Sequence, residues 1–118
     1  MAFMSKVDSL ATQPEVLGEY LVTIPAEALP RLISNRLEAD HMVALLKAAE
    51  LLEPHKGYSI LNFLTTVARF DMAAMFLADT DRAVAASAFA KIKDAAELGK
   101  IPGVSGADVA KVASKYCA

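Results

Sequence analysis

The chain has 118 residues, a formal net charge of −2 and one cysteine, and 55% of its residues are hydrophobic. This length favours a single domain built on one hydrophobic core. The small negative charge and the absence of any Lys/Arg run argue against a nucleic-acid binder, which normally carries a basic patch. Because the lone thiol of Cys117 cannot build a disulfide framework, we expect a reducing compartment, the cytosol or also the nucleus.

No membrane segment is expected. The first residues lack the basic start and apolar run of a secretory leader. The longest uncharged stretch, residues 57–68, is far shorter than the ~20 residues that a membrane span needs. Alanine, the best helix former, supplies 23 of the 118 residues, and alternating β-branched runs and hairpin turns are missing. The sequence therefore predicts an all-α fold.

Apolar residues at helical spacing predict a compact bundle of about six to seven short helices in antiparallel hairpins. One of the predicted segments contains Pro30, where we expect a kink or a split. The predicted helical segments, in chain order, are 3–11, 14–24, 26–35, 39–52, 57–69, 69–76, 79–98 and 105–116. Without an internal repeat or a long linker, residues 1–118 are expected to form one domain.

Proline and glycine mark the expected helix boundaries. Pro14 suits the first position of a helix, where a missing N–H has little cost. Pro54 is expected to end the segment 39–52, and Gly99 to stop the segment 79–98. Ser105 followed three residues later by Asp108 predicts a capping box at the start of the last helix.

Residues 69–81, RFDMAAMFLADTD, carry two apolar stripes on one short helix. At about 100° per residue, one side collects Phe70, Ala73, Ala74 and Leu77. The opposite side collects Arg69, Met72, Met75 and Phe76, with Asp71 at its edge.

Two interpretations fit these stripes. The helix could lie at the centre of the bundle, buried all round. Alternatively, one side packs on the core and the other faces a protein partner, because methionine, phenylalanine and arginine are favoured at interfaces. Arg69 and Asp71, so close together, indicate that part of the helix reaches solvent.

Enzyme chemistry is not expected. His41 and His55 have no HExxH or CxxC context, so we interpret them as surface or capping residues and predict no metal and no cofactor. Glu50 and Glu53 are expected to be solvated carboxylates, and Cys117 has no histidine positioned beside it by sequence. The glycine-containing segment 97–106 lacks the residue order of a phosphate-binding loop.

The segment RFDMAAMFL, followed by DTDRAVAASAFAKI, resembles the central signature of the C-terminal domain of the RNA polymerase II-associated protein three family. Sperm-associated antigen one and certain ciliary dynein-arm assembly factors have similar domains. PEVLGEYLVTI resembles the opening helix of that domain, and ISNRLEADHMVALLKA resembles its third region. The likeness covers residues 14–116 and is strongest from Arg69 to Ile92.

The resemblance implies a compact, non-enzymatic protein-interaction domain of a cochaperone scaffold. In the family, this domain tethers RuvB-like AAA+ ATPases to the chaperone-dependent assembly of RNA polymerase, ribonucleoproteins, PIKK kinases or dynein arms. Carried onto this chain, the resemblance implies partner-binding roles for Arg69, Met72, Met75 and Phe76. It implies a monomeric domain with a protein partner and neither nucleic acid nor membrane.

The chain also departs from the family pattern. It lacks the tetratricopeptide repeats that usually precede this domain, and its segment 83–90 is unusually rich in alanine. Two other function classes stay open: a self-associating helical module, and a helical bundle that binds a small apolar ligand in a cavity of ~300 Å³ or more.

Overall fold

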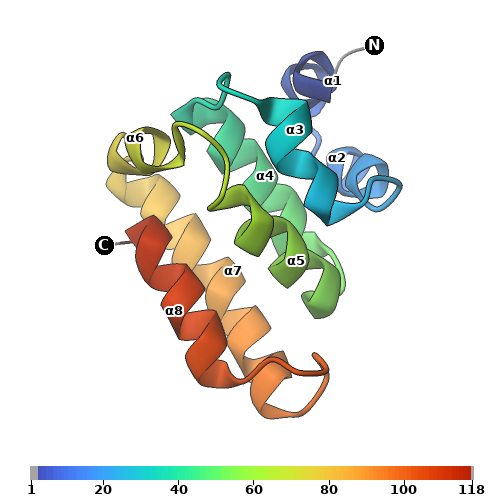
Figure 1. Cartoon of the computed structure of the whole chain (residues 1–118), viewed down its shortest axis with the longest axis vertical. Helices are drawn as coiled ribbons and strands as arrows, with labels where there is room; N and C mark the ends of the chain where they lie inside the picture. Colours follow the sequence, from blue (N-terminus) through green and yellow to red (C-terminus); the bar gives the residue numbers. More distant parts are fainter. Residues whose placement is uncertain (1–2, 118) are drawn as a thin grey trace.

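The computed structural model describes residues 3–117, which form eight α-helices and one short 3-10 helix and contain no strand (Figure 1). The predicted all-α fold is therefore confirmed. Each of the eight predicted segments holds one α-helix, one more than the six to seven helices expected for the bundle, and residues 65–69 form a turn between two of them. The helices are α1 (Phe3–Leu10), α2 (Pro14–Leu21), η1 (Ala26–Ala28), α3 (Leu29–Ile33), α4 (Ala39–Leu51), α5 (Pro54–Leu64), α6 (Phe70–Met75), α7 (Asp79–Glu97) and α8 (Gly106–Cys117).

The bundle is organised around α4, which packs against α2, α5 and α7 (Figure 1). The helix pair α7 and α8 runs antiparallel, as does the pair α4 and α5, because a short connection joins each pair. The short helix α6 lies at the edge of the bundle where α7 begins, and it contacts both α4 and α8. The end of the last helix thus lies close to the segment with the two stripes.

Prolines mark several helix boundaries. The segment 39–52 ends before Pro54 as expected, since α4 ends at Leu51. The start of the next helix, expected at residue 57, was predicted too late, because Pro54 is the first residue of α5. Proline is well tolerated there because the first N–H groups of a helix have no intrahelical partner. The split expected near Pro30 is confirmed, since 3-10 helix η1 gives way to α3 at Leu29 and Pro30 lies in the first turn of α3.

The predicted capping box at the start of α8 is confirmed. The Ser105 hydroxyl accepts the Asp108 backbone N–H at 3.2 Å, and the Asp108 carboxylate accepts the Ser105 backbone N–H at 2.9 Å. These bonds satisfy donors that a helix start would otherwise leave free. They also lower the pKa of the Asp108 carboxyl below its ordinary value, first through the backbone N–H and then through the hydroxyl of Ser105.

The core is made of aliphatic side chains, Phe3 and a separate cluster of three aromatic rings. Tyr116 of α8 is 1% exposed, and its ring lies 4.9 Å from that of Phe70 and 5.0 Å from that of Phe89. Its hydroxyl donates to the carbonyl oxygen of Leu61, so the buried polar atom has a partner. Gly57 allows α5 to approach α4 closely, because an added Cβ would lie 2.8 Å from the carbonyl oxygen of Ala49.

Two negative findings apply to the described part of the chain. None of its helices combines the length and apolar character that crossing a bilayer requires. Among the same residues, His, Cys, Asp and Glu side chains do not gather in groups of three or more that could hold a metal ion.

Candidate protein-interaction site

The candidate site is built on α6, a helix of six residues that begins after a left-handed residue. Arg69, at φ 71° and ψ 7°, turns the chain into the helix. A helix this short is not stable alone, because its nucleation cost exceeds the gain from so few hydrogen bonds. Its conformation therefore depends on the side chains that it buries.

One stripe of α6 is anchored in the core. Its residues are almost fully buried, and the ring of Phe70 packs edge-to-face on Tyr116 at an interplanar angle of 80°. Such aromatic pairs contribute ~0.5–1.5 kcal/mol beyond the burial of their area. The buried stripe consists of Phe70, Ala73, Ala74 and Leu77, as the helical spacing indicated.

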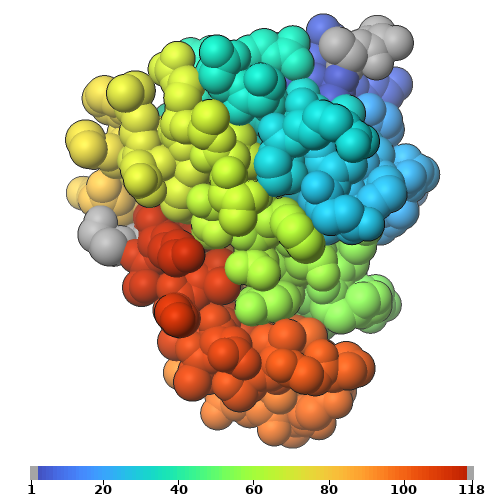
Figure 2. Space-filling view, in the orientation of Figure 1, coloured from blue at the N-terminus to red at the C-terminus, as the bar shows by residue number. Residues whose placement is uncertain are grey.

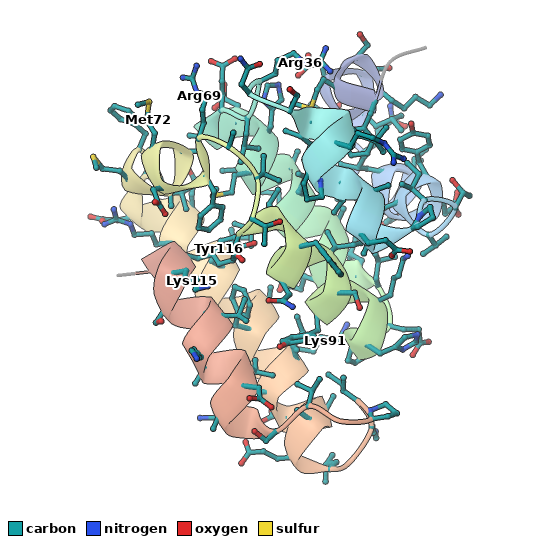
Figure 3. The ribbon with its side chains drawn as sticks, in the orientation of Figure 1. Arg36, Arg69, Met72, Lys91, Lys115 and Tyr116 are labelled. Carbon is teal, nitrogen blue, oxygen red and sulfur yellow. The ribbon has the colours of Figure 1, made fainter. Side chains whose placement is uncertain are left out.

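The other stripe lies in solvent. Met72 is 50% exposed, and Met75 and Phe76 are each 70% exposed. Arg69 and Met72 lie at the outer edge of the molecule in Figure 3, and α6 projects from the upper left edge in Figure 2. The interpretation of a helix buried all round is therefore wrong, because α4 and α8 cover only one side of α6. We call Arg69, Met72, Met75 and Phe76 the exposed stripe.

Among the described residues, the Arg69 side chain makes one hydrogen bond, which lies within the exposed stripe. Its Nη2 donates to the sulfur of Met72 at 3.7 Å. Within residues 3–117, no carboxylate lies at ion-pair distance from its guanidinium. A left-handed conformation costs a non-glycine residue ~1–2 kcal/mol because of its Cβ. Arginine, unlike glycine, is therefore strained at this position. Strained residues of this kind cluster at functional sites.

Two depressions flank the exposed stripe and are open to solvent. One, of about 260 Å³, lies between α6 and the start of α4, and its far wall is formed by residues 37–40. The other, of about 680 Å³, is bordered by the turn 65–69 and by Met75. Met72 and Phe76 line both depressions and form the ridge between them.

Residues 37–40, which form one wall of the site, were not predicted to belong to it. Leu37, Glu38, Ala39 and Asp40 are about thirty positions from α6, and no local pattern marks them as neighbours of it. They reach the site because Leu37 is buried in the core and α4 begins beside α6. Only the packing of α4 on α6 brings a pair of carboxylates next to the exposed stripe.

The histidines and Glu50 lie in separate places and do not form a common metal or catalytic site. His41 Nδ1 accepts the Glu38 backbone N–H at 3.1 Å, and its Nε2 lies 2.9 Å from the Asp8 carboxylate, so the expected capping role is confirmed. His55 is exposed in the first turn of α5. Glu50 accepts a hydrogen bond from the Ser87 hydroxyl at 2.8 Å. The side chain of Cys117 lies outside the described side chains.

Comparison with known proteins agrees with this architecture. The family described as "Potential Monad-binding region of RPAP3" matches residues 1–82, which include all of α6 and end where the alanine-rich segment begins. This match also covers residues 1–13, which the resemblance seen in the sequence did not include.

Individual relatives point to the same family. RNA polymerase II-associated protein 3 of Homo sapiens is 31% identical over 85 residues, which are 68% of this chain and 13% of that protein. The Rattus norvegicus protein is 31% identical over 78 residues, 62% of this chain and 12% of the relative. The chain therefore spans about an eighth of the length of these relatives.

A solved structure extends the similarity to α7 and α8. The NMR structure of the C-terminal domain of the human RPAP3 protein superimposes with a TM-score of 0.81 and 25% identity, over 98% of this chain and 84% of that one. The fold continues beyond residue 82, where the family match ends. The chain belongs to the RPAP3 C-terminal domain family, and it is a protein-interaction domain of that family.

Proposed function

We propose that this domain is a non-enzymatic tether that binds a RuvB-like AAA+ ATPase through the exposed stripe. The single observation that carries the proposal is the division of α6 into two faces. Phe70 and the other residues of the buried stripe anchor the helix in the core, while the side chains of Met72 and Phe76 are exposed to solvent and form a ridge. A soluble domain gains nothing in its own stability from such exposed side chains, so the ridge favours an intermolecular role.

The composition of the exposed stripe fits a protein partner. Phenylalanine and methionine supply apolar area at the centre of an interface, and Met72 and Met75 can adapt their shape to the partner. Arg69 can form a charge-assisted pair at the edge of the contact. The buried stripe fixes the backbone of α6 before a partner binds, which lowers the conformational entropy lost on binding.

The proposed role is to join the ATPase to a cochaperone assembly. In this role, the domain would serve the chaperone-dependent assembly of large complexes and would act in the cytoplasm, and also in the nucleus. The domain is proposed to act as a monomer. Monad is the second candidate partner, because the family description names it and the matched residues 1–82 contain the whole exposed stripe.

The test is an affinity measurement between the purified chain and a purified RuvB-like ATPase. Met72→Glu should weaken binding by ~2 kcal/mol or more, as expected for the loss of an interface anchor. Leu51→Glu is the matched control, since Leu51 is 53% exposed and Met72 is 50% exposed, but Leu51 lies at the far end of α4. Equal losses in both variants, or no binding by the unsubstituted chain, would refute the ATPase proposal.

The same variants distinguish the other candidate roles. Binding to Monad that Met72→Glu abolishes and Leu51→Glu preserves would reassign the exposed stripe to that partner. Light scattering at high concentration tests self-association, because a dimer seam on the ridge would double the mass of the unsubstituted chain and of Leu51→Glu but not that of Met72→Glu. The small-ligand alternative receives no support from the depressions beside α6, which are open to solvent rather than enclosed in the core.

A further inference from the structure

The surface around the ridge carries more negative than positive charge. Three carboxylates, those of Glu38, Asp40 and Asp71, line the two depressions, and Arg69 is the cation that lines them. Three negative charges against one positive charge leave a net charge of −2, as large as the net charge of the whole chain. The surface around the ridge is thus net acidic.

The two carboxylates of the α4 wall differ in how far they are already engaged. The Glu38 side chain accepts the backbone N–H of His41 in the capping box of α4. Asp40 is exposed, and among the described residues it has neither a side-chain hydrogen bond nor an ion pair. Asp40 lies in the first turn of α4, on the side that faces the depression. Its carboxylate is therefore available to a ligand.

Polarity also differs between the two sides of the ridge. The depression next to α4 contains Glu38 and Asp40, whereas the one next to the turn 65–69 is bordered mainly by apolar groups such as Val67 and Ala68. A partner that covers both must place a cationic group on the α4 side and an apolar group on the other side. Charge complementarity of this kind fixes the orientation of a complex and rejects acidic partners.

We propose that the exposed stripe docks a basic segment of its partner, in which a lysine or arginine side chain pairs with Asp40 while apolar side chains cover Met72 and Phe76. This inference rests on the proposed function and adds to it the chemistry of the partner surface. Arg69, in the same exposed stripe, then contacts an acidic group or a backbone carbonyl of the partner. The alternation of cation and anion would hold the docked segment in one register.

The test is a charge reversal at Asp40, with affinity for the purified RuvB-like ATPase measured at low and at high salt. Asp40→Lys should weaken binding about tenfold or more, because a cation would then face a cation. Asp40→Asn should weaken binding less and reduce its salt dependence, since one screened ion pair is removed. Asp94→Lys is the control: it makes the same change in net charge at an exposed site in the last turn of α7, away from α6.

Melting temperatures of all three variants show whether the fold is retained. If the unsubstituted chain binds the ATPase and Asp40→Lys binds it equally well or more tightly, the inference of a basic segment is overturned. The proposal that the domain binds the ATPase would then still stand. An equal loss in Asp94→Lys would also overturn it, because the effect would then be one of net charge. If the unsubstituted chain fails to bind the ATPase, the tether proposal fails, and the same variants are measured with Monad. If the chain binds neither protein, both the proposed binding role of the exposed stripe and the inferred basic segment of the partner are overturned.

Discussion

The ring of Phe70 lies 4.9 Å from that of Tyr116, edge-to-face, and this contact joins the helix that carries the exposed stripe to the last helix of the chain. The two residues are 46 positions apart, and both are almost completely buried. Phe70 is thus the anchor of α6, whereas Met72, two positions later, is half exposed. Opposite effects of substitution are expected at these two neighbours.

Phe70→Glu should unfold the domain. An unpaired carboxylate in the aromatic cluster would cost ~4 kcal/mol or more, a large part of the ~5–15 kcal/mol that stabilises a typical domain. Thermal melting by circular dichroism measures the change. Met72→Glu, with the same charge, should stay within about 0.5 kcal/mol of the unsubstituted protein. If Met72→Glu unfolds the protein while Phe70→Glu remains folded, the assignment of the two faces is wrong.

Tyr116→Phe should destabilise the domain by ~1–3 kcal/mol, because the buried carbonyl oxygen of Leu61 would lose its donor. The amide of Thr65 bonds to Asn62 rather than to Leu61, so the end of α5 offers no substitute close by. Chemical denaturation gives the free energy of unfolding. A variant as stable as the unsubstituted chain would mean that water or a backbone rearrangement satisfies this carbonyl.

Alkaline pH should destabilise the domain through the same residue. Burial raises the pKa of Tyr116 well above the ordinary value of 10.0, so the folded state favours the neutral phenol. The stability is fully present below the unfolded pKa and is lost as pH rises from there toward the folded pKa. Tyr116→Phe should flatten this decline, leaving the smaller contribution of Tyr58, whose pKa is raised by burial and by Asp108. An identical decline in both proteins would contradict this assignment.

Arg69→Gly should make the domain more stable and yet weaken its binding. Glycine adopts the left-handed conformation at φ 71° without strain, which should give a net gain of about 0.5–1 kcal/mol after the greater entropy of the unfolded chain is subtracted. Affinity for the ATPase should fall because the guanidinium is lost. Arg69→Ala keeps the strain and also loses the guanidinium, so it should bind as weakly without the gain in stability. Undiminished affinity of both variants would remove Arg69 from the binding site.

Gly57→Ala should cost ~1–3 kcal/mol, since the new Cβ would lie 2.8 Å from the Ala49 carbonyl oxygen and would push α5 away from α4. Gly106→Ala is the control. Its Cβ would meet the flexible side chain of Glu97 at 2.9 Å, which can move aside, and alanine favours the helix. Thermal melting of the two variants checks the contrast, and equal stability would show that the α4–α5 contact can relax.

Much of the fold follows from local rules in the sequence. Apolar spacing locates the helices, and the Ser105–Asp108 pair marks the start of α8, because capping depends on residues only three positions apart. The same spacing separates Phe70 from Met72 on α6. Pro54 shows the limit of such rules. Proline can end one helix or begin the next, and here it begins α5.

Other features were decided by tertiary structure alone. The sequence shows two apolar stripes on α6, but the side that is buried is determined by Tyr116 of α8 and by the packing of α4, which lie far away in the chain. The left-handed backbone of Arg69 has no local signal, since arginine rarely adopts it. Asp40 and Met72 line the same depression only because α4 packs against α6. Contacts between distant residues depend on how helices pack, and helical periodicity carries no information about which helix will be the neighbour.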